Sequence, residues 1–189
     1  MKATEHHENR CCLVKYILDW IEEMVQGLVV IALVFTFLFR LVTVTGTSMV
    51  PNYQNGDVIL ITDYLATPKQ GDVVVLSGVL SEPIIKRVIA VENQTVDFDP
   101  ETKSVVVNNC PVDDKNFGIE VGITDLPDTN YPLLDFPQTV PEGCVFVLGD
   151  NRPISEDSRY QAVGMVDCRH ILGKALFRIL PLKDIGPVK

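Results

Sequence analysis

The longest apolar run of the chain lies near its N-terminus, over residues 25–44, where only Gln26, Arg40 and the threonines are polar. A helix over this run would extend about 30 Å, which is enough to cross the hydrocarbon core of a bilayer. Arg40 lies near the end of the run, where its long side chain can reach the headgroups. We predict an uncleaved anchor, because the run starts only at Val25 and no Ala-x-Ala site follows it. A buried core helix is the alternative.

The basic residues around this run predict its orientation. Arg10 and Lys15 precede it, whereas no Lys or Arg follows Arg40 until Lys69. Basic flanking residues stay preferentially in the cytoplasm, although Arg40 itself counts in the other direction. The expected organisation is a cytoplasmic lead-in (1–24), a transmembrane helix (25–44) and an extracytoplasmic domain (45–189).

From Thr43 onward the pattern changes to short runs of β-branched and aliphatic residues. The clearest runs are 58–61, 73–76, 84–91, 105–107, 145–148 and 171–179. Turn signals such as Asn55-Gly56-Asp57 and Gly149-Asp150-Asn151 separate them, which is typical of a mostly β domain. Residues 108–142 are the least regular part, with seven acidic residues against Lys115 alone. We expect them to form long loops or an inserted flap with solvated charges.

Composition narrows the class of protein further. The chain has 25 acidic and 16 basic residues, a net charge of −9, so it has no general attraction to nucleic acid. Its five cysteines include no Cys-x-x-Cys pair and are not spaced with the three histidines as a metal-binding set. No metal site is predicted, and the pairing of Cys110, Cys144 and Cys168 is left open.

A candidate nucleophile lies in a predicted tight turn. Ser48 follows Gly46-Thr47 and precedes Met49-Val50-Pro51. Glycine and proline at these positions favour an exposed turn that directs a hydroxyl outward and leaves backbone N–H groups free. From this motif alone, an ordinary turn serine is the alternative.

A candidate base lies in the run 84–91, at Lys86 or its neighbour Arg87. Neighbouring residues of a strand face opposite sides, so one of the two should point inward and the other outward. An inward lysine is desolvated, which favours the neutral amine that a general base requires. The alternative is that both are charges of an edge strand that hinder aggregation.

A third motif, residues 149–159, places three acids, two serines and two arginines directly after an apolar strand. Polar residues this dense are typical of a hydrogen-bonded network that fixes a loop. No histidine is placed to complete a Ser-His-Asp triad, since His6 and His7 precede the anchor and His170 lies directly before an ordinary predicted strand.

In this order, four motifs resemble the successive boxes of type I signal peptidases, in the short single-anchor form typical of Gram-positive bacteria. They are Ser48-Met49-x-Pro51, Gly71-Asp72-Val73-Val74, Lys86-Arg87-Val88 and the eleven-residue box 149–159. The resemblance extends from the anchor to about Pro181. It implies a mostly β fold in which an N-terminal transmembrane helix precedes an antiparallel β-barrel-like catalytic domain with an irregular inserted loop region.

The resemblance also implies roles for individual residues. Ser48 would be the nucleophile and Lys86 the general base of a Ser/Lys dyad, and the Ser48 N–H would supply part of the oxyanion hole. Many relatives add a hydroxyl two residues before the nucleophile, where this chain has Gly46. The supporting residues would be Ser155, which orients the lysine, and the ion pair of Asp157 with Arg159. The residues lining the substrate pockets would be Met49, Ile84 and Ile85.

The implied activity is removal of N-terminal signal peptides from exported preproteins, at Ala-x-Ala sites beside the membrane and without a cofactor. Two departures bear on substrate preference and loop geometry. Residues 90–93 read Ala-Val-Glu-Asn where the family usually has a glycine-rich turn, and Asn52-Tyr53 replaces the usual Thr-Leu. The oligomeric state and the breadth of the substrate set are not predicted.

Two other functions remain open at this point. A self-cleaving Ser/Lys protease of the SOS-repressor type has a similar serine turn and lysine strand, but it lacks the anchor and the box 149–159. A non-catalytic relative that assists the assembly of surface proteins would be expected to have lost Ser48 or Lys86. Cleavage of a separate preprotein distinguishes the three functions.

Overall fold

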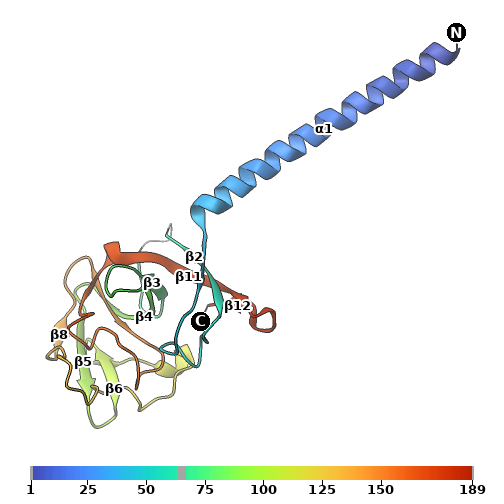
Figure 1. Ribbon diagram of the computed structural model, residues 1–189. Helices are drawn as coiled ribbons and strands as arrows, with labels where there is room; N and C mark the ends of the chain where they lie inside the picture. Colours follow the sequence, from blue (N-terminus) through green and yellow to red (C-terminus); the bar gives the residue numbers. More distant parts are fainter. Residues whose placement is uncertain (1, 64–66, 189) are drawn as a thin grey trace. The chain divides into compact units, whose positions relative to one another are not determined.

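The computed structural model describes residues 2–63 and 67–188, and it divides into two units between Phe39 and Arg40 (Figure 1). The first unit is the helix α1 (Lys2–Leu38). Its segment Lys15–Leu38 is long and apolar enough to cross a membrane, with a mean hydropathy of 1.9 and no residue buried within the chain. The apolar helix expected near the N-terminus is therefore confirmed, and the described part of the lead-in belongs to the same helix.

The end of this helix differs from the prediction, which placed it at Val44. The helix ends at Leu38, and Arg40–Thr43 form strand β1, which pairs antiparallel with β2 (Val58–Thr62). Aliphatic and β-branched residues such as Leu41, Val42 and Thr43 favour a strand once a neighbouring strand is available. Arg40 therefore starts a strand and pairs with Asp63 at 3.9 Å.

The second unit contains an antiparallel sheet that carries the chemistry-bearing residues. In spatial order its strands are β1, β2, β11 (Ile171–Leu180), β3 (Val73–Leu76), β4 (Ile84–Val91), β9 (Cys144–Leu148) and β10 (Val166–Asp167), with β12 (Gly186–Pro187) beside β11. No pairing joins β1 to β10 within the described residues, so the sheet is a half-barrel. The mostly β, barrel-like fold is confirmed.

A smaller sheet covers part of the larger one. Its strands lie in the order β7 (Cys110–Pro111), β6 (Ser104–Val107), β5 (Thr95–Asp99) and β8 (Gln138–Thr139). Three short 3-10 helices complete the described elements: η1 (Asp114–Phe117), η2 (Cys168–His170) and η3 (Leu182–Asp184). Residues 108–142 hold only β7, η1 and β8, which confirms their irregular character.

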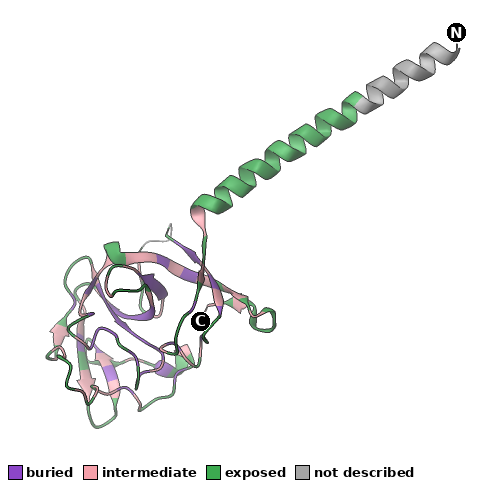
Figure 2. Cartoon of the chain, viewed as in Figure 1, coloured by how far each residue is buried: buried purple, intermediate pink, exposed green. Residues whose placement is uncertain are grey.

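Strand β4 is buried along most of its length because both of its faces are covered. Its six successive residues 85–90 are all buried, as the purple segments of Figure 2 illustrate. Ile85 packs in one cluster with residues of β2, β3 and the nucleophile turn. Ile89 and Ala90 pack in another cluster with β5 and β6. Any polar side chain on β4 must therefore find a partner inside the domain.

Candidate active site

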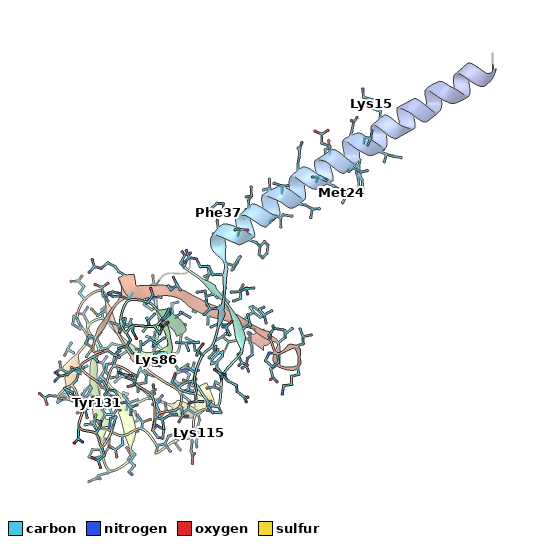
Figure 3. The ribbon with its side chains drawn as sticks, in the orientation of Figure 1. Lys15, Met24, Phe37, Lys86, Lys115 and Tyr131 are labelled. Atoms are coloured by element: carbon cyan, nitrogen blue, oxygen red, sulfur yellow. The ribbon has the colours of Figure 1, made fainter. Side chains whose placement is uncertain are left out.

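The structure brings Ser48 and Lys86 together. The Lys86 Nζ lies 3.0 Å from the Ser48 Oγ, and it donates a second hydrogen bond to the Ile85 carbonyl at 3.1 Å. Lys86 is 3% exposed, whereas Ser48 is half-buried and reachable from solvent. Figure 3 shows Lys86 within the body of the domain. The separation allows a proton to pass between oxygen and nitrogen in either direction.

Burial lowers the pKa of Lys86 below its ordinary value of 10.5. The charges of Asp157, Glu156 and Asp150 oppose this shift, in that order of strength, but desolvation is the larger effect. Lys86 makes no ion pair within the described residues, since its two contacts are a hydroxyl and a carbonyl. The site therefore makes the neutral amine easier to form than it is for an exposed lysine.

The turn that carries Ser48 is fixed from two sides. Internally, Val50 N–H donates to Thr47 O at 3.2 Å and Tyr53 N–H donates to Met49 O at 2.9 Å. From the box, Asn151 N–H donates to Ser48 O at 2.9 Å, and its side-chain amide donates to Thr47 O at 3.1 Å. The orientation of Ser48 thus depends on residues about a hundred positions away in the chain.

Gly46 leaves space, and the Ser48 N–H offers a hydrogen-bond donor, for an oxygen that develops a negative charge. Gly46 has a φ of 89°, a conformation that L side chains rarely adopt, and no atom lies within 4 Å of the position that a Cβ would take. Its own N–H donates to Asn55 Oδ1 at 2.9 Å. The Ser48 N–H donates to no group among the described residues, so it is available to an incoming oxygen.

The residue after Lys86 is not a solvated charge. Arg87 is fully buried on β4, which is an inner strand of the sheet, so the edge-strand alternative is wrong. Its guanidinium donates to both oxygens of Asp150, at 2.7 and 2.6 Å, and to Gly71 O at 2.9 Å. It also lies over the Phe117 ring, 4.9 Å from the centroid. The second sheet and the inserted residues cover this face of β4.

Two further buried ion pairs hold the box 149–159. Asp157 binds Arg159 through both oxygens, at 2.9 and 3.0 Å, and also accepts from Gly149 N–H at 3.1 Å. Arg152 donates to Asp114 at 2.6 Å and to the Thr124 hydroxyl at 2.6 Å. These contacts immobilise the loop that holds Ser48.

Asp114 is a buried acid in the region that was expected to carry only solvated charges. Asp114 is 2% exposed, and burial raises the pKa of its carboxyl although Arg152 opposes the shift. Its neighbour Asp113 is exposed and only caps the short helix η1. The adjacent Asp-Asp pair carries no signal that distinguishes the buried acid from the exposed one.

Asn52 and Ser155 differ in their hydrogen bonding. The Asn52 side-chain amide donates to Phe117 O at 2.7 Å and to Asp150 Oδ2 at 2.8 Å, so this departure from the family pattern ties the nucleophile loop to the box. Ser155 is 1% exposed, and its Oγ has no hydrogen-bond partner among the described residues. A Cβ on Gly149 would collide with the Ser155 side chain and with Ser48 O, so only glycine fits there.

A cleft of about 360 Å³ lies beside the dyad. Its walls are the segments 42–45 and 82–85, together with Ile59 and Val75. Two of the three expected pocket residues, Ile84 and Ile85, therefore line it. Met49 does not line this cleft but packs in the same apolar cluster as Ile85. Cys110, Cys144 and Cys168 all carry free thiols.

Comparisons with known proteins identify the family of the chain. The family model described as signal peptidase, peptidase S26, matches residues 17–180. Signal peptidase IB of Staphylococcus aureus (strain COL) is 30% identical over 181 residues, which cover 90% of this chain and 93% of that protein. Signal peptidase I of Bacillus licheniformis is 29% identical over 177 residues, 88% and 90% of the two chains. The crystal structure of a signal peptidase I from Enterococcus faecalis aligns with a TM-score of 0.41 and 27% identity, over 57% of this chain and 95% of that one. The chain belongs to the signal peptidase family, peptidase S26.

Proposed function

We propose that this protein is a membrane-anchored serine endopeptidase that removes N-terminal signal peptides from exported preproteins, with Ser48 as nucleophile and Lys86 as general base. The observation that carries the proposal is the 3.0 Å approach of a buried amine, which has no ion-pair partner among the described residues, to a half-buried serine hydroxyl. Neutral Lys86 accepts the Ser48 proton as the oxygen attacks the scissile carbonyl. The Ser48 N–H stabilises the oxyanion, and Gly46 leaves space for it.

The second half of the reaction uses the same amine. Protonated Lys86 gives its proton to the departing amino group, which leaves an acyl-enzyme on Ser48. The neutral amine then accepts a proton from water, and the resulting hydroxide releases the signal peptide. No cofactor takes part in these steps. Reuse of one base requires that its pKa be low enough for the neutral form to return after each proton transfer.

The supporting residues act on the loop and on the amine. Asp157 and Arg159 fix the box, because their ion pair also binds Gly149 N–H and Arg152 O. The buried Ser155 Oγ has no hydrogen-bond partner in the described part of the chain, so it is suited to hold the Lys86 amine after it has received a proton. Asn151 then keeps the nucleophile in register with both groups.

The cleft next to Ile84 and Ile85 is suited to the residues before the scissile bond. Among the described residues strand β1 pairs with β2 alone, so an extended substrate can add to the sheet beside the cleft. Small side chains, as in Ala-x-Ala, fit shallow apolar walls of this kind. The proposed topology places residues 1–24 in the cytoplasm and residues 45–189 outside it, where signal peptides emerge beside the bilayer.

Cleavage in trans tests the proposal. Full-length protein in detergent is incubated with a preprotein that carries an Ala-x-Ala signal peptide, and the mature product is quantified. Wild type should release it, whereas Ser48→Ala and Lys86→Arg should not, because guanidinium does not deprotonate in proteins. Lys115→Arg is the matched control, since Lys115 is exposed on the inserted region (Figure 3). Normal cleavage by Lys86→Arg would contradict the dyad.

The pH dependence provides a second readout. The neutral amine is the active form, so the rate should rise with pH along a limb whose midpoint lies below 10.5. Cleavage confined to the chain itself would indicate a self-cleaving protease, and absence of any cleavage a non-catalytic relative. Digestion of the β domain by protease added to intact protoplasts would support the topology, whereas protection would overturn it.

A further inference from the structure

A second cavity, of about 570 Å³, lies on the box side of the domain, outside the site described above. Its walls come from two segments: Tyr131 and Pro132 of the inserted region, and five residues in or directly after the box, namely Ile154, Glu156, Tyr160, Gln161 and Ala162. Two apolar side chains at its rim are strongly exposed, with Tyr131 74% and Ile154 62% accessible. We call this cavity the box groove.

The box groove is preformed. Leu133 and Tyr160 form an antiparallel bridge, and Leu134 N–H donates to Arg159 O at 2.9 Å. Gln161 extends this pairing, since its backbone N–H donates to Pro132 O at 3.0 Å and its side-chain amide to Leu133 O at 2.8 Å. Two strand-like segments held in this way need little reordering when a ligand binds, which reduces the entropic cost.

The box groove is linked to the dyad through hydrogen bonds of the box. Ile154 and Glu156 flank the buried Ser155 in the chain, and the backbone N–H groups of Ile154 and Ser155 both donate to Asn151 O. Asn151 in turn binds Ser48 O at 2.9 Å. The Glu156 carboxylate raises the pKa of Lys86 against the effect of burial, so its charge is felt at the amine. One side of the groove is therefore built from the loop that holds the nucleophile.

The groove and the cleft near Ile84 are formed by different segments of the domain. The cleft is made by the segments that immediately precede Ser48 and Lys86, whereas the groove is made by the box and the inserted region. Because Asn151 of the box binds Ser48 O, a substrate strand that enters along β1 and passes Ser48 comes next to the box.

We infer that the box groove binds the part of the preprotein that follows the scissile bond, and that it selects an apolar or aromatic side chain there. Tyr131, Ile154 and Tyr160 provide the apolar walls, while Glu156 at the same groove disfavours an acidic residue. This inference rests on the proposed function, because an endopeptidase cuts inside a chain that necessarily extends beyond its cleavage site. It adds a determinant of specificity on the mature side of the bond.

A substrate scan tests it. Preproteins with one signal peptide receive Phe, Ser or Asp at each of the first five mature positions, and full-length protein in detergent is assayed for kcat/KM. At one or two positions wild type should cleave the Phe substrate about tenfold faster than the Ser substrate, as expected for one apolar contact. Tyr131→Ser combined with Ile154→Ser should bring this ratio close to one.

Two further variants make the test specific. Val121→Ser is the control, because Val121 is 50% exposed in the same inserted region but does not line the groove, and it should leave the ratio unchanged. Glu156→Gln should improve the Asp substrate relative to the Phe substrate about threefold or more, as removal of a nearby like charge does. Ratios between two substrates of the same enzyme cancel any change in the Lys86 pKa.

The outcomes separate the two proposals. Equal kcat/KM for Phe, Ser and Asp substrates at every position would overturn the groove and leave the peptidase function intact. A preference that survives in the double variant would also overturn it. If wild type cleaves none of the preproteins, the proposed function fails and the inference fails with it. If the double variant unfolds, Tyr131→Ser alone decides, since Tyr131 is exposed.

Discussion

Replacement of Arg87 by lysine should destabilise the domain strongly, although it keeps the positive charge. From strand alternation alone Arg87 points away from the dyad, which predicts that the change is tolerated. The structure agrees that it points away, but places the guanidinium against Asp150 with both partners fully buried. A lysine can offer a single point charge there, not the planar fork that binds both carboxylate oxygens.

The magnitude follows from the contacts that are lost. Lysine keeps one of the two bonds to Asp150 and loses the other, together with the bond to Gly71 O and the contact with the Phe117 ring. A hydrogen bond to a charged group contributes about 1.5–3 kcal/mol and a ring contact about 0.5–2 kcal/mol, so losing two such bonds and the ring contact should cost roughly 3.5–8 kcal/mol. For a domain of this size that lowers Tm by about 7–30 °C.

Thermal unfolding measured by circular dichroism at pH 7 tests this prediction. Arg169→Lys is a matched control, because Arg169 makes a similar two-oxygen pair with Asp167 but its side chain is 89% exposed. That variant should unfold with wild type. Arg87→Lys should still cleave preprotein well below its Tm, since its side chain faces away from Ser48. An Arg87→Lys Tm within about 2 °C of wild type would refute the argument from two-oxygen geometry.

Three other substitutions separate stability from catalysis. Lys86→Met should be inactive yet unfold at a higher temperature than wild type at pH 7. Burial lowers the Lys86 pKa, so at pH values below the pKa of the unfolded chain the folded state must desolvate the charged amine or release its proton, and both reduce stability. The difference in Tm should shrink as pH approaches 10.5, which calorimetry at several pH values would show. Ser155→Ala should change Tm by about 1 °C or less, because its Oγ has no partner, while lowering kcat about tenfold or more in the preprotein assay. Asp114→Asn should lower the free energy of unfolding, measured in urea, by about 3–5 kcal/mol, because it leaves buried Arg152 without its charged partner. Exposed Asp128→Asn should leave that free energy almost unchanged.

The sheet was predictable from the sequence wherever a strand is apolar on both faces. The predicted runs 73–76 and 84–91 coincide with β3 and β4, and the other four lie within one residue of a strand at each end. Strand β5 (Thr95–Asp99) escaped because acidic residues interrupt it and only Val96 is fully buried. The two-residue strands are too short to show a periodic pattern in the sequence, since they are defined by pairing alone.

The helix end and the buried acid were not predictable for a different physical reason. Leu41, Val42 and Val44 are apolar enough to continue a membrane helix, and only pairing with β2 makes Arg40–Thr43 a strand. Asp114 is distinguished from Asp113 by Arg152, which lies 38 residues further along the chain. Both outcomes rest on partners distant in sequence, which local composition does not encode.

The adjacent residues Lys86 and Arg87 are both buried on one strand, yet their surroundings treat their positive charges differently. Both are almost completely buried on β4, so desolvation acts on both side chains. Arg87 meets a carboxylate at 2.6 Å, which compensates for burial and fixes the loop that begins at Asp150. Lys86 meets a hydroxyl and a carbonyl instead, with carboxylates acting only from a distance. A buried amine without an ion pair loses its proton more readily, whereas guanidinium does not deprotonate in proteins. The order Lys-Arg therefore suits a base on one face of the strand and a structural ion pair on the other, and the reversed order would place a permanent cation beside Ser48.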